Sequence, residues 1–203
     1  MQNNCFTLTV GTQAYKRKPT NWGTVTNDFK AHGAREVTYN ELLSLIEQGH
    51  CWSGACQQRG KWDKKGNGFI SQQVFGVDID NATPLLDEEG NKVKDENNKT
   101  VKRALRPDEE GYLRPLDALR HCVGLKDDIE PLCMYATFSN APEWPRFRLV
   151  FLLDEPVTEW SDAETVLLWL MSEFPECDEE CKNPNRLYAG TTAGGVIPLR
   201  GLL

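Results

Sequence analysis

The sequence lacks the segments that direct a chain into or across a membrane. No N-terminal stretch joins basic residues to an apolar run of signal-peptide length, and no window approaches the about 18 consecutive apolar residues that span a bilayer. We therefore expect a cytoplasmic protein without a membrane partner. Internal repeats and low-complexity tracts are absent as well. With 203 residues, 39% of them hydrophobic and 26% charged, the chain can bury one sizeable core, so we expect a single compact domain.

The sequence also lacks a disulfide framework. Its seven cysteines are odd in number and scattered along the chain, which indicates reduced thiols. A zinc site at His50, Cys51 and Cys56, or at Cys177 and Cys181, is a minor alternative. Because the spacings are not those of a zinc ribbon or finger, we do not expect structural zinc.

An excess of positive charge is missing too. The formal net charge is −7, whereas a protein coated in nucleic acid usually has a basic balance or a basic stripe. Acidic residues gather in 87–110 and 154–180. The basic residues of interest lie outside these segments: Lys16, Arg17, Lys18, Arg59, Lys61, Lys64, Lys65, Arg146, Arg148 and Arg186. A local basic groove on an acidic protein is compatible with this distribution.

Hydrophobic periodicity predicts two strong helices and one short helix. Thr38 to Glu41 has the form of a capping box before an amphipathic stripe that ends at Gly49, and this is the one clear helix of the first 70 residues. Ser161 to Glu164 repeats the capping-box form before a helix that Pro175 stops. The short helix is predicted at residues 116–123.

Three apolar runs predict strands. Residues 73–79 form a buried strand with acids at its exit, and residues 132–138 and 146–153 form an antiparallel hairpin with two prolines in its turn. Short strand candidates lie at 187–189 and 196–199. The polar, turn-rich segment at about 83–114 is predicted to be a surface insertion.

The exit of the first predicted strand carries two acids. A strand places residues i and i+2 on one face, so Asp78 and Asp80 point the same way while Ile79 faces the core. Their mutual repulsion is relieved by a divalent cation, and oxygen ligands of this kind suit Mg²⁺ or Mn²⁺. The alternative is that Asp80 and Asn81 only begin a turn. The apolar run ahead of the pair favours a bound cation, because it makes the second acid costly otherwise.

The predicted hairpin carries a second set of polar side chains. Arg146 and Arg148 share one strand face, where two guanidiniums can hold phosphate oxygens through forked hydrogen bonds. Thr137 and Ser139 also share a face, so that hydroxyls and guanidiniums could meet across the hairpin. The alternative is a solvated face that is salt-bridged to the acids after the strand.

A third segment follows the last helix. Asp178 could be a third metal carboxylate, and Arg186 a further phosphate contact. An acidic turn without a role is equally compatible with this segment taken alone. The order and spacing of all three segments are more specific than any one of them: DID at 78–80, TFSN at 137–140 with PRFRLVFLLDEP at 145–156, and CDEECKNPNRLYAG at 177–190.

This combination resembles the archaeo-eukaryotic primase superfamily, in particular the prim-pol domains at the N-terminus of phage, prophage and plasmid replication proteins. The resemblance covers roughly residues 74–190. It implies an α+β fold in which an antiparallel-sheet core related to the RNA-recognition motif (71–203) forms a cleft with a smaller N-terminal α/β subdomain (1–70). It also implies that the chain is part of a longer replication protein.

The resemblance implies a DNA-templated primase-polymerase, a nucleotidyltransferase that makes or extends primers with two divalent metal ions, Mg²⁺ or Mn²⁺. Asp78, Asp80 and Asp178 would bind the metals. The nucleoside triphosphate would be held by Ser139, Asn140, Arg146, Arg148 and Arg186, and de novo initiation requires a second nucleotide in the cleft. A helicase domain in the same chain or a partner would act with it. Candidates to grip a single-stranded DNA template are Tyr15, Lys16, Arg17, Lys18, Trp22, Trp52, Arg59 and Trp62, although such tryptophans are more often core residues.

The sequence departs from the family pattern at one position. A histidine that contacts phosphate is usual in or near the Ser139 motif, but Asn140 and Ala141 follow the serine here. Either the arginines and Asn140 suffice, or this copy binds nucleotide poorly. One alternative function is therefore a catalytically weak or inactive prim-pol fold that binds nucleic acid. A more distant alternative is a glycosyltransferase that uses Asp-x-Asp to bind a sugar nucleotide.

Overall fold

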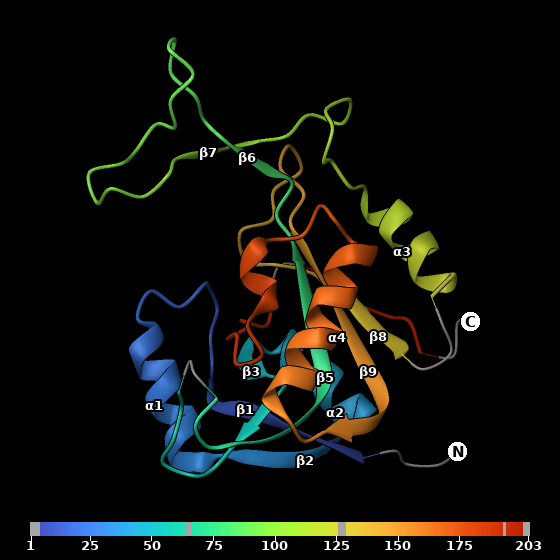
Figure 1. The fold of residues 1–203 in the computed structure, drawn as a ribbon. Helices are drawn as coiled ribbons and strands as arrows, with labels where there is room; N and C mark the ends of the chain where they lie inside the picture. The colour runs from blue at the N-terminus through green and yellow to red at the C-terminus, as the bar shows by residue number, and fades with distance from the viewer. Residues whose placement is uncertain (1–4, 64–65, 126–128, 193, 201–203) are drawn as a thin grey trace.

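The computed structural model describes residues 5–63, 66–125, 129–192 and 194–200. Lys64 and Lys65, two of the predicted basic residues, lie outside the described residues. The described chain is a mixed α+β fold with two larger antiparallel sheets, a small two-stranded sheet and four α-helices (Figure 1). The α+β class predicted from the sequence is confirmed.

The larger sheet has five strands and the second sheet has three. The first runs in the order β10 (Val196–Pro198), β8 (Ile129–Ala136), β9 (Phe147–Val157), β5 (Phe69–Ile79) and β4 (Ala55–Gln57). The second runs in the order β2 (Ala34–Thr38), β1 (Cys5–Ala14) and β3 (His50–Ser53). The helices are α1 (Trp22–His32), α2 (Tyr39–Glu47), α3 (Pro115–Val123) and α4 (Trp160–Glu173), with a short 3₁₀ helix η1 (Glu179–Lys182). No described helix is long and apolar enough to cross a bilayer.

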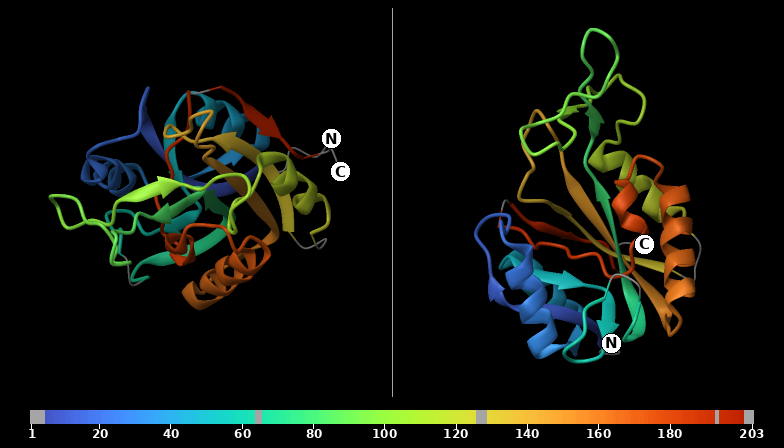
Figure 2. Two further views of the ribbon diagram at one scale, coloured as in Figure 1. Left: turned by 90° about the horizontal axis from the view of Figure 1, so that it is seen from above. Right: turned by 60° about the vertical axis from the view of Figure 1, so that its left-hand side comes forward.

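From Val74 onward strand β5 is buried on both faces, and its alternating side chains enter two different cores. Phe75, Val77 and Ile79 pack with residues of α3 and α4 on one face of the sheet. Val74, on the opposite face, packs with the N-terminal strands and α2. Figure 2 shows the two layers on either side of the five-stranded sheet. By the same alternation, Asp78 lies on the face that is turned toward the N-terminal layer.

The N-terminal 70 residues contain two helices rather than the single helix predicted. Helix α2 begins as expected, because the Thr38 side chain accepts a hydrogen bond from the Glu41 amide at 3.2 Å. Helix α1 is the addition: Asn21 caps it by accepting from the Thr24 amide at 3.3 Å. Its only buried residues are Val25 and Phe29, so its polar sequence has too narrow an apolar stripe to predict a helix.

Later in the chain the predicted elements are confirmed with shifted boundaries. Strands β8 and β9 form the antiparallel hairpin, and α3 covers the predicted short helix. Helix α4 begins one residue before Ser161, with Glu159 at its N-cap position and no side-chain cap. Ser161 is thus inside the first turn, and the predicted capping box does not form. Strand β10 confirms the C-terminal candidate, while Tyr188 makes only a single bridge, to Trp52.

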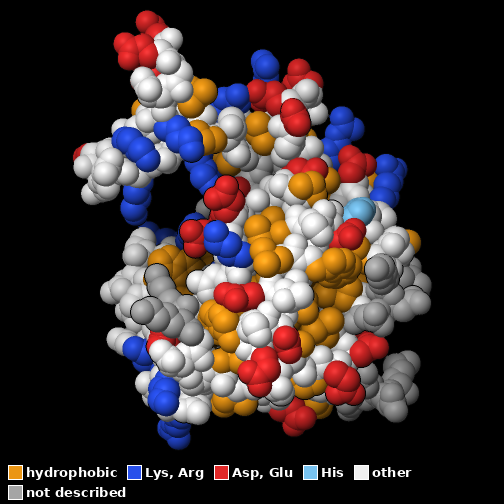
Figure 3. Space-filling view, viewed as in Figure 1, with side chains coloured by type: hydrophobic (Ala, Val, Ile, Leu, Met, Phe, Trp, Pro, Cys, Tyr) orange, Lys and Arg blue, Asp and Glu red, His pale blue; other side chains and the backbone are white. Residues whose placement is uncertain are grey.

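Residues 83–114, the predicted insertion, project from the top of the molecule and carry charges of both signs (Figures 1 and 3). The base of the projection is the two-stranded sheet of β6 (Ala82–Pro84) and β7 (Lys102–Ala104). Asn81 ties this base to the core. Its side chain is 1% exposed, and it accepts from the Leu113 amide at 2.8 Å and donates to the carbonyls of Leu113 at 3.0 Å and Pro145 at 2.9 Å. The exit of β5 beside Asp80 is therefore fixed in place.

Candidate functional site

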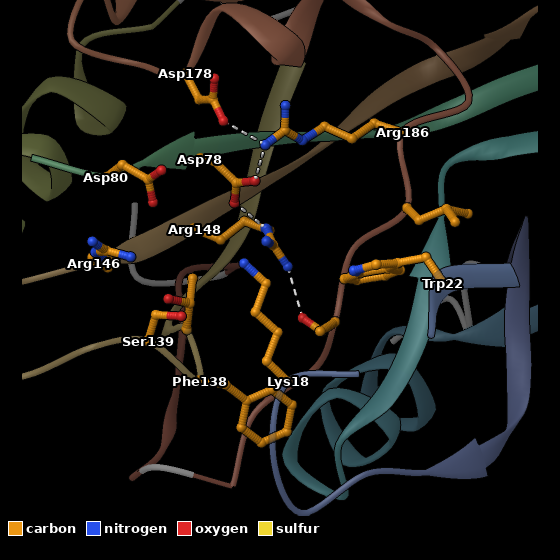
Figure 4. A pocket seen from close by; sticks show the side chains of 13 residues that line it. Lys18, Trp22, Asp78, Asp80, Phe138, Ser139, Arg146, Arg148, Asp178 and Arg186 are labelled. Carbon is orange, nitrogen blue, oxygen red and sulfur yellow. Dashed lines mark hydrogen bonds and ion pairs between the residues drawn. The ribbon is translucent and has the colours of Figure 1, made fainter. Parts of the chain in front are cut away.

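Four separated parts of the chain meet around one cavity of about 140 Å³ (Figure 4). They are the end of β5, the loop and first residues of the β8–β9 hairpin, the segment from η1 onward, and the stretch that leads into α1. The side chains that line the cavity include Lys18, Trp22, Asp78, Asp80, Thr137, Ser139, Arg146, Arg148, Asp178 and Arg186. Three carboxylates and four cationic groups thus face the same small volume.

Asp78 is held between two arginines. Its side chain is buried, and the residue is 6% exposed. One carboxylate oxygen accepts from Nε of Arg148, and the other accepts from Nη2 of Arg186 at 2.8 Å. Burial acts to raise the pKa of Asp78, but the two guanidiniums outweigh it and hold that pKa below its usual value. Asp78 is therefore ionised, and both its oxygens are occupied.

Arg186 bridges two carboxylates. Its Nη2 also donates to Asp178 at 2.8 Å, so a single nitrogen lies between Asp78 and Asp178. Burial acts to raise the pKa of Asp178 as well, and the guanidinium of Arg186 reverses the shift, so that the pKa lies below its usual value. The other terminal nitrogen of Arg186, Nη1, is buried and has no hydrogen-bond partner among the described residues.

Arg148 is tied to the scaffold as well as to Asp78. It lies directly opposite Asp78 in the β5–β9 register. Its Nη1 donates to the hydroxyl of Tyr135 at 2.6 Å and to the carbonyl of Ala189 at 2.7 Å. The Tyr135 hydroxyl also accepts from the indole of Trp52 at 2.9 Å and donates to Ala189 at 3.0 Å. A buried chain of hydrogen bonds therefore runs from the N-terminal sheet to the acid.

Gly76 allows the ring of Tyr188 to pack closely against strand β5, beside Arg148. Gly76 lies two residues before Asp78 on the same strand face, and a Cβ there would approach Cζ of Tyr188 to 2.7 Å. The Tyr188 hydroxyl donates to the Gly76 carbonyl at 2.7 Å, and the guanidinium of Arg148 lies 4.5 Å from the ring centroid. The close approach of ring and backbone thus fixes the position of Arg148.

The groups at the mouth of the cavity have fewer partners. The carboxylate of Asp80 has no hydrogen bond or ion pair recorded with any described residue, although its carbonyl accepts from the indole of Trp144 at 2.8 Å. The guanidinium of Arg146 lies 3.6 Å above the Trp144 ring. Its Nε is buried and unpartnered within the described chain. Two charged groups of opposite sign are therefore available here to a ligand.

All the predicted site residues except Asn140 line the cavity. The Asn140 side chain instead accepts from the Arg146 amide at 3.0 Å, which closes the hairpin loop. No local sequence pattern predicts that Tyr135 orients Arg148, because that contact depends on strand register. Lys18 and Trp22, predicted only as template contacts, line this cavity too. Trp52, another template candidate, is a core residue at 1% exposure.

A divalent cation is the group that the sequence pattern implies here, and the donor types fit it, because carboxylate oxygens suit Mg²⁺ and Mn²⁺. As they stand, no three carboxylate, imidazole or thiol groups of the described residues converge closely enough to hold a metal. Nη2 of Arg186 lies between Asp78 and Asp178, while Asp80 faces the same cavity. Asp78, Asp80 and Asp178 are the residues that would hold such a cation.

Compared with known proteins, the chain matches no family model, no curated protein and no solved structure. Its function has to be inferred from the site itself. The informative property of that site is its mixture of charges. Asp78, Asp80 and Asp178 contribute three negative charges, and Lys18, Arg146, Arg148 and Arg186 contribute four positive ones. Such a cavity is suited to a ligand that brings both an anion and a cation.

Proposed function

We propose that the chain is the catalytic domain of a primase-polymerase of the archaeo-eukaryotic primase type, a metal-dependent nucleotidyltransferase acting on a single-stranded DNA template. One observation carries the proposal: three carboxylates and four cationic side chains from distant segments line one cavity. A nucleoside triphosphate with its divalent cations has the matching charges. A role beside a helicase in the replication of a mobile element is part of the same proposal.

The topology supports a core related to the RNA-recognition motif. Apart from the inserted strands β6 and β7, the chain order β5, α3, β8, β9, α4 is the strand-helix-strand-strand-helix part of that motif, and β9 lies between β5 and β8 in the sheet. The position of the last strand differs, since β10 pairs with β8 rather than with β5. The cleft would lie where Lys18 and Trp22 face this sheet across the cavity.

In this proposal the ion pairs of the resting site are exchanged when substrate binds. Asp78 and Asp178 pass from the guanidinium of Arg186 to the cations, with Asp80 as the third carboxylate. Arg186 then turns toward a phosphate, beside Arg146 and Lys18. Each charged group keeps a partner of opposite charge during this exchange, because it gains a new partner as it loses the old one.

The residues of the hairpin position the triphosphate. Ser139 and Thr137 offer hydroxyl donors at the cavity, and Arg146 offers a guanidinium whose plane is held on Trp144. Arg148 acts as a positioning residue, because two of its nitrogens are committed to Asp78, Tyr135 and Ala189. When bound, divalent cations supply activation of the attacking 3′-hydroxyl and stabilisation of the pyrophosphate that leaves.

The experiment compares single-residue variants in primer extension and in de novo synthesis with Mn²⁺ or Mg²⁺. Asp80→Ala is the sharpest variant, since this carboxylate supports no ion pair within the described chain and its loss leaves the buried pairs intact. Asp154→Ala, an exposed acid of β9, is the matched control. We expect Asp80→Ala to lose at least about a hundredfold in nucleotide incorporation and Asp154→Ala to keep wild-type incorporation.

A second candidate is a catalytically inactive module that binds nucleic acid. It is favoured by one observation: no histidine follows Ser139, where the family usually has one in or near the motif, and the Asn140 side chain accepts from the Arg146 amide instead of lining the cavity. The same assays separate the two candidates. Template binding by the wild type without incorporation under either metal would establish the binding module and reject the polymerase.

A further inference from the structure

A second cavity, of about 400 Å³, adjoins the site and shares Trp22, Arg186 and Leu187 with the first. Its other lining residues include Thr26, Trp62 and Asn183. The two indoles are half-buried, so parts of two large aromatic surfaces face a space that opens to solvent. Of the residues that line this second cavity, Arg186 takes part in the ion-pair exchange described above, and Trp62, Thr26 and Asn183 do not.

The walls of this second cavity are fixed. The ring of Trp62 packs edge-on against Phe29, with centroids 5.1 Å apart and an interplanar angle of 67°. Asn185 donates to the carbonyl of Asp63 at 2.6 Å, which ties the residue next to Trp62 to the segment that carries Arg186. Trp22 begins α1, whose Val25 and Phe29 are buried in the same cluster. A flat ligand would meet surfaces that are already in place.

Beside the carboxylate of Glu180, the cavity is lined by two polar side chains of the kinds that bind nucleotides, Arg186 and Asn183. Arg186 faces both cavities, and its buried Nη1 has no partner among the described residues, so an anionic group at the boundary would satisfy it. Asn183 accepts from the Asn185 amide at 3.3 Å through its side-chain oxygen, which leaves its amide nitrogen for a ligand. Aromatic faces with an adjacent arginine and a side-chain amide are typical of base stacking and phosphate contact.

We propose that this second cavity binds a nucleobase between Trp22 and Trp62, with the phosphate of that nucleotide at Arg186. The proposal rests on the proposed function and adds a second base-binding position to it. The base belongs either to the template strand or to the nucleotide that starts a chain. Both carry the same chemistry, and the test distinguishes them.

The test uses intrinsic tryptophan fluorescence without divalent metal, so that it does not depend on catalysis. The protein is titrated with a short oligodeoxythymidylate, with a nucleoside triphosphate, and with inorganic tripolyphosphate, which lacks a base. Trp62→Leu is compared with Trp160→Leu. The control is matched, because Trp160, at the start of α4, also makes one edge-on contact, with Phe69 at 5.6 Å, and is not among the residues that line either cavity.

We expect quenching by a base-containing ligand and none by tripolyphosphate. Trp62→Leu should weaken that ligand about tenfold or more, as loss of one stacking partner does, while Trp160→Leu binds like wild type. Asn183→Ala gives a second, milder loss that leaves the aromatic packing untouched. Tight binding of the oligonucleotide alone assigns the cavity to the template, and binding of the triphosphate alone assigns it to a nucleotide.

Equal affinity of wild type, Trp62→Leu and Asn183→Ala for both ligands would overturn the proposal. That outcome differs from failure of the proposed function. If the protein incorporates no nucleotide but Trp62→Leu weakens ligand binding, the proposed function fails and the base site stands. If the protein is an active polymerase but Trp62→Leu leaves the ligand affinities unchanged, the base site fails and the proposed function stands.

Discussion

The inner and outer parts of the site are built differently. In the inner part, Asp78, Arg148 and Arg186 are largely buried, and their charges are satisfied by one another and by Tyr135, Ala189 or Asp178. In the outer part, Asp80 and Arg146 lie at the mouth of the cavity with few partners. The inner part holds the fold together before any ligand arrives, and the outer part is free to bind one.

The difference has an energetic cause. Removing one member of a buried ion pair leaves the other charge without solvent or partner, whereas an exposed charge keeps its hydration. Asp78 and Asp80, two carboxylates that are only two residues apart, therefore have different roles. Asp78 is structural in the resting state, and Asp80 is not. Each of the following predictions breaks or sharpens this contrast.

The largest expected effect is on stability. Asp78→Asn should lower the free energy of unfolding by about 3–5 kcal/mol, because it leaves Arg148 and Arg186 buried without their shared counterion. Asp80→Asn should change it by less than about 0.5 kcal/mol. Urea unfolding at neutral pH measures both. Equal losses in the two variants would remove the distinction between the inner and outer acids.

Acid pH should narrow the difference in stability between wild type and Asp78→Asn. The pKa of Asp78 is lowered in the folded state, so its contribution to stability is complete above the unfolded value of about 3.9 and is lost as pH falls from there toward the folded pKa. We expect the two unfolding free energies to converge below pH ~4, by up to about 1.4 kcal/mol per pH unit. If the difference in unfolding free energy between the two proteins stayed constant down to pH 2, Asp78 would not be the group that titrates.

A smaller loss of stability than that of Asp78→Asn is expected in the hairpin loop at the mouth. Asn140→Ala removes the hydrogen bond from the Arg146 amide, which should lower the free energy of unfolding by about 1 kcal/mol. The inner ion pairs should be unaffected, because Asn140 takes no part in the hydrogen bonds that form them. The thermal unfolding of Asn140→Ala is compared with that of Ser139→Ala. Ser139 has no side-chain hydrogen bond with the described residues, so the difference between the two variants isolates the contribution of the Asn140 hydrogen bond. A loss as large as that of Asp78→Asn would show that mouth and interior are one cooperative unit.

Sequence periodicity was sufficient to place the acids. Strand alternation predicts that Asp78 and Asp80 share a face, and both side chains line the cavity. It also predicts that Arg146 and Arg148 point the same way. Periodicity says nothing of what lies opposite, so the pairing of Asp78 with Arg148 across β5 and β9 could not be predicted without the register.

Other parts of the site depend on packing that no local pattern reveals. Tyr135 is an ordinary strand residue in the sequence, yet it orients Arg148 because Trp52 and Ala189 are brought to its hydroxyl. Helix α1, which positions Trp22, was missed because only a narrow stripe of it is apolar. Asn81 looked like a turn residue and proves to be a buried anchor for two loops.

The contacts of Asp78 also set an order of events during synthesis and folding. Its hydrogen-bond partners Arg148, Cys181 and Arg186 lie 70, 103 and 108 residues further along the chain. Such distant pairings form late, since the intervening chain must close its loops first. A nascent chain that has not yet reached Arg186 has the acid without its counterions. The contacts of the inner site therefore form only after Arg186 has been made and has reached Asp78.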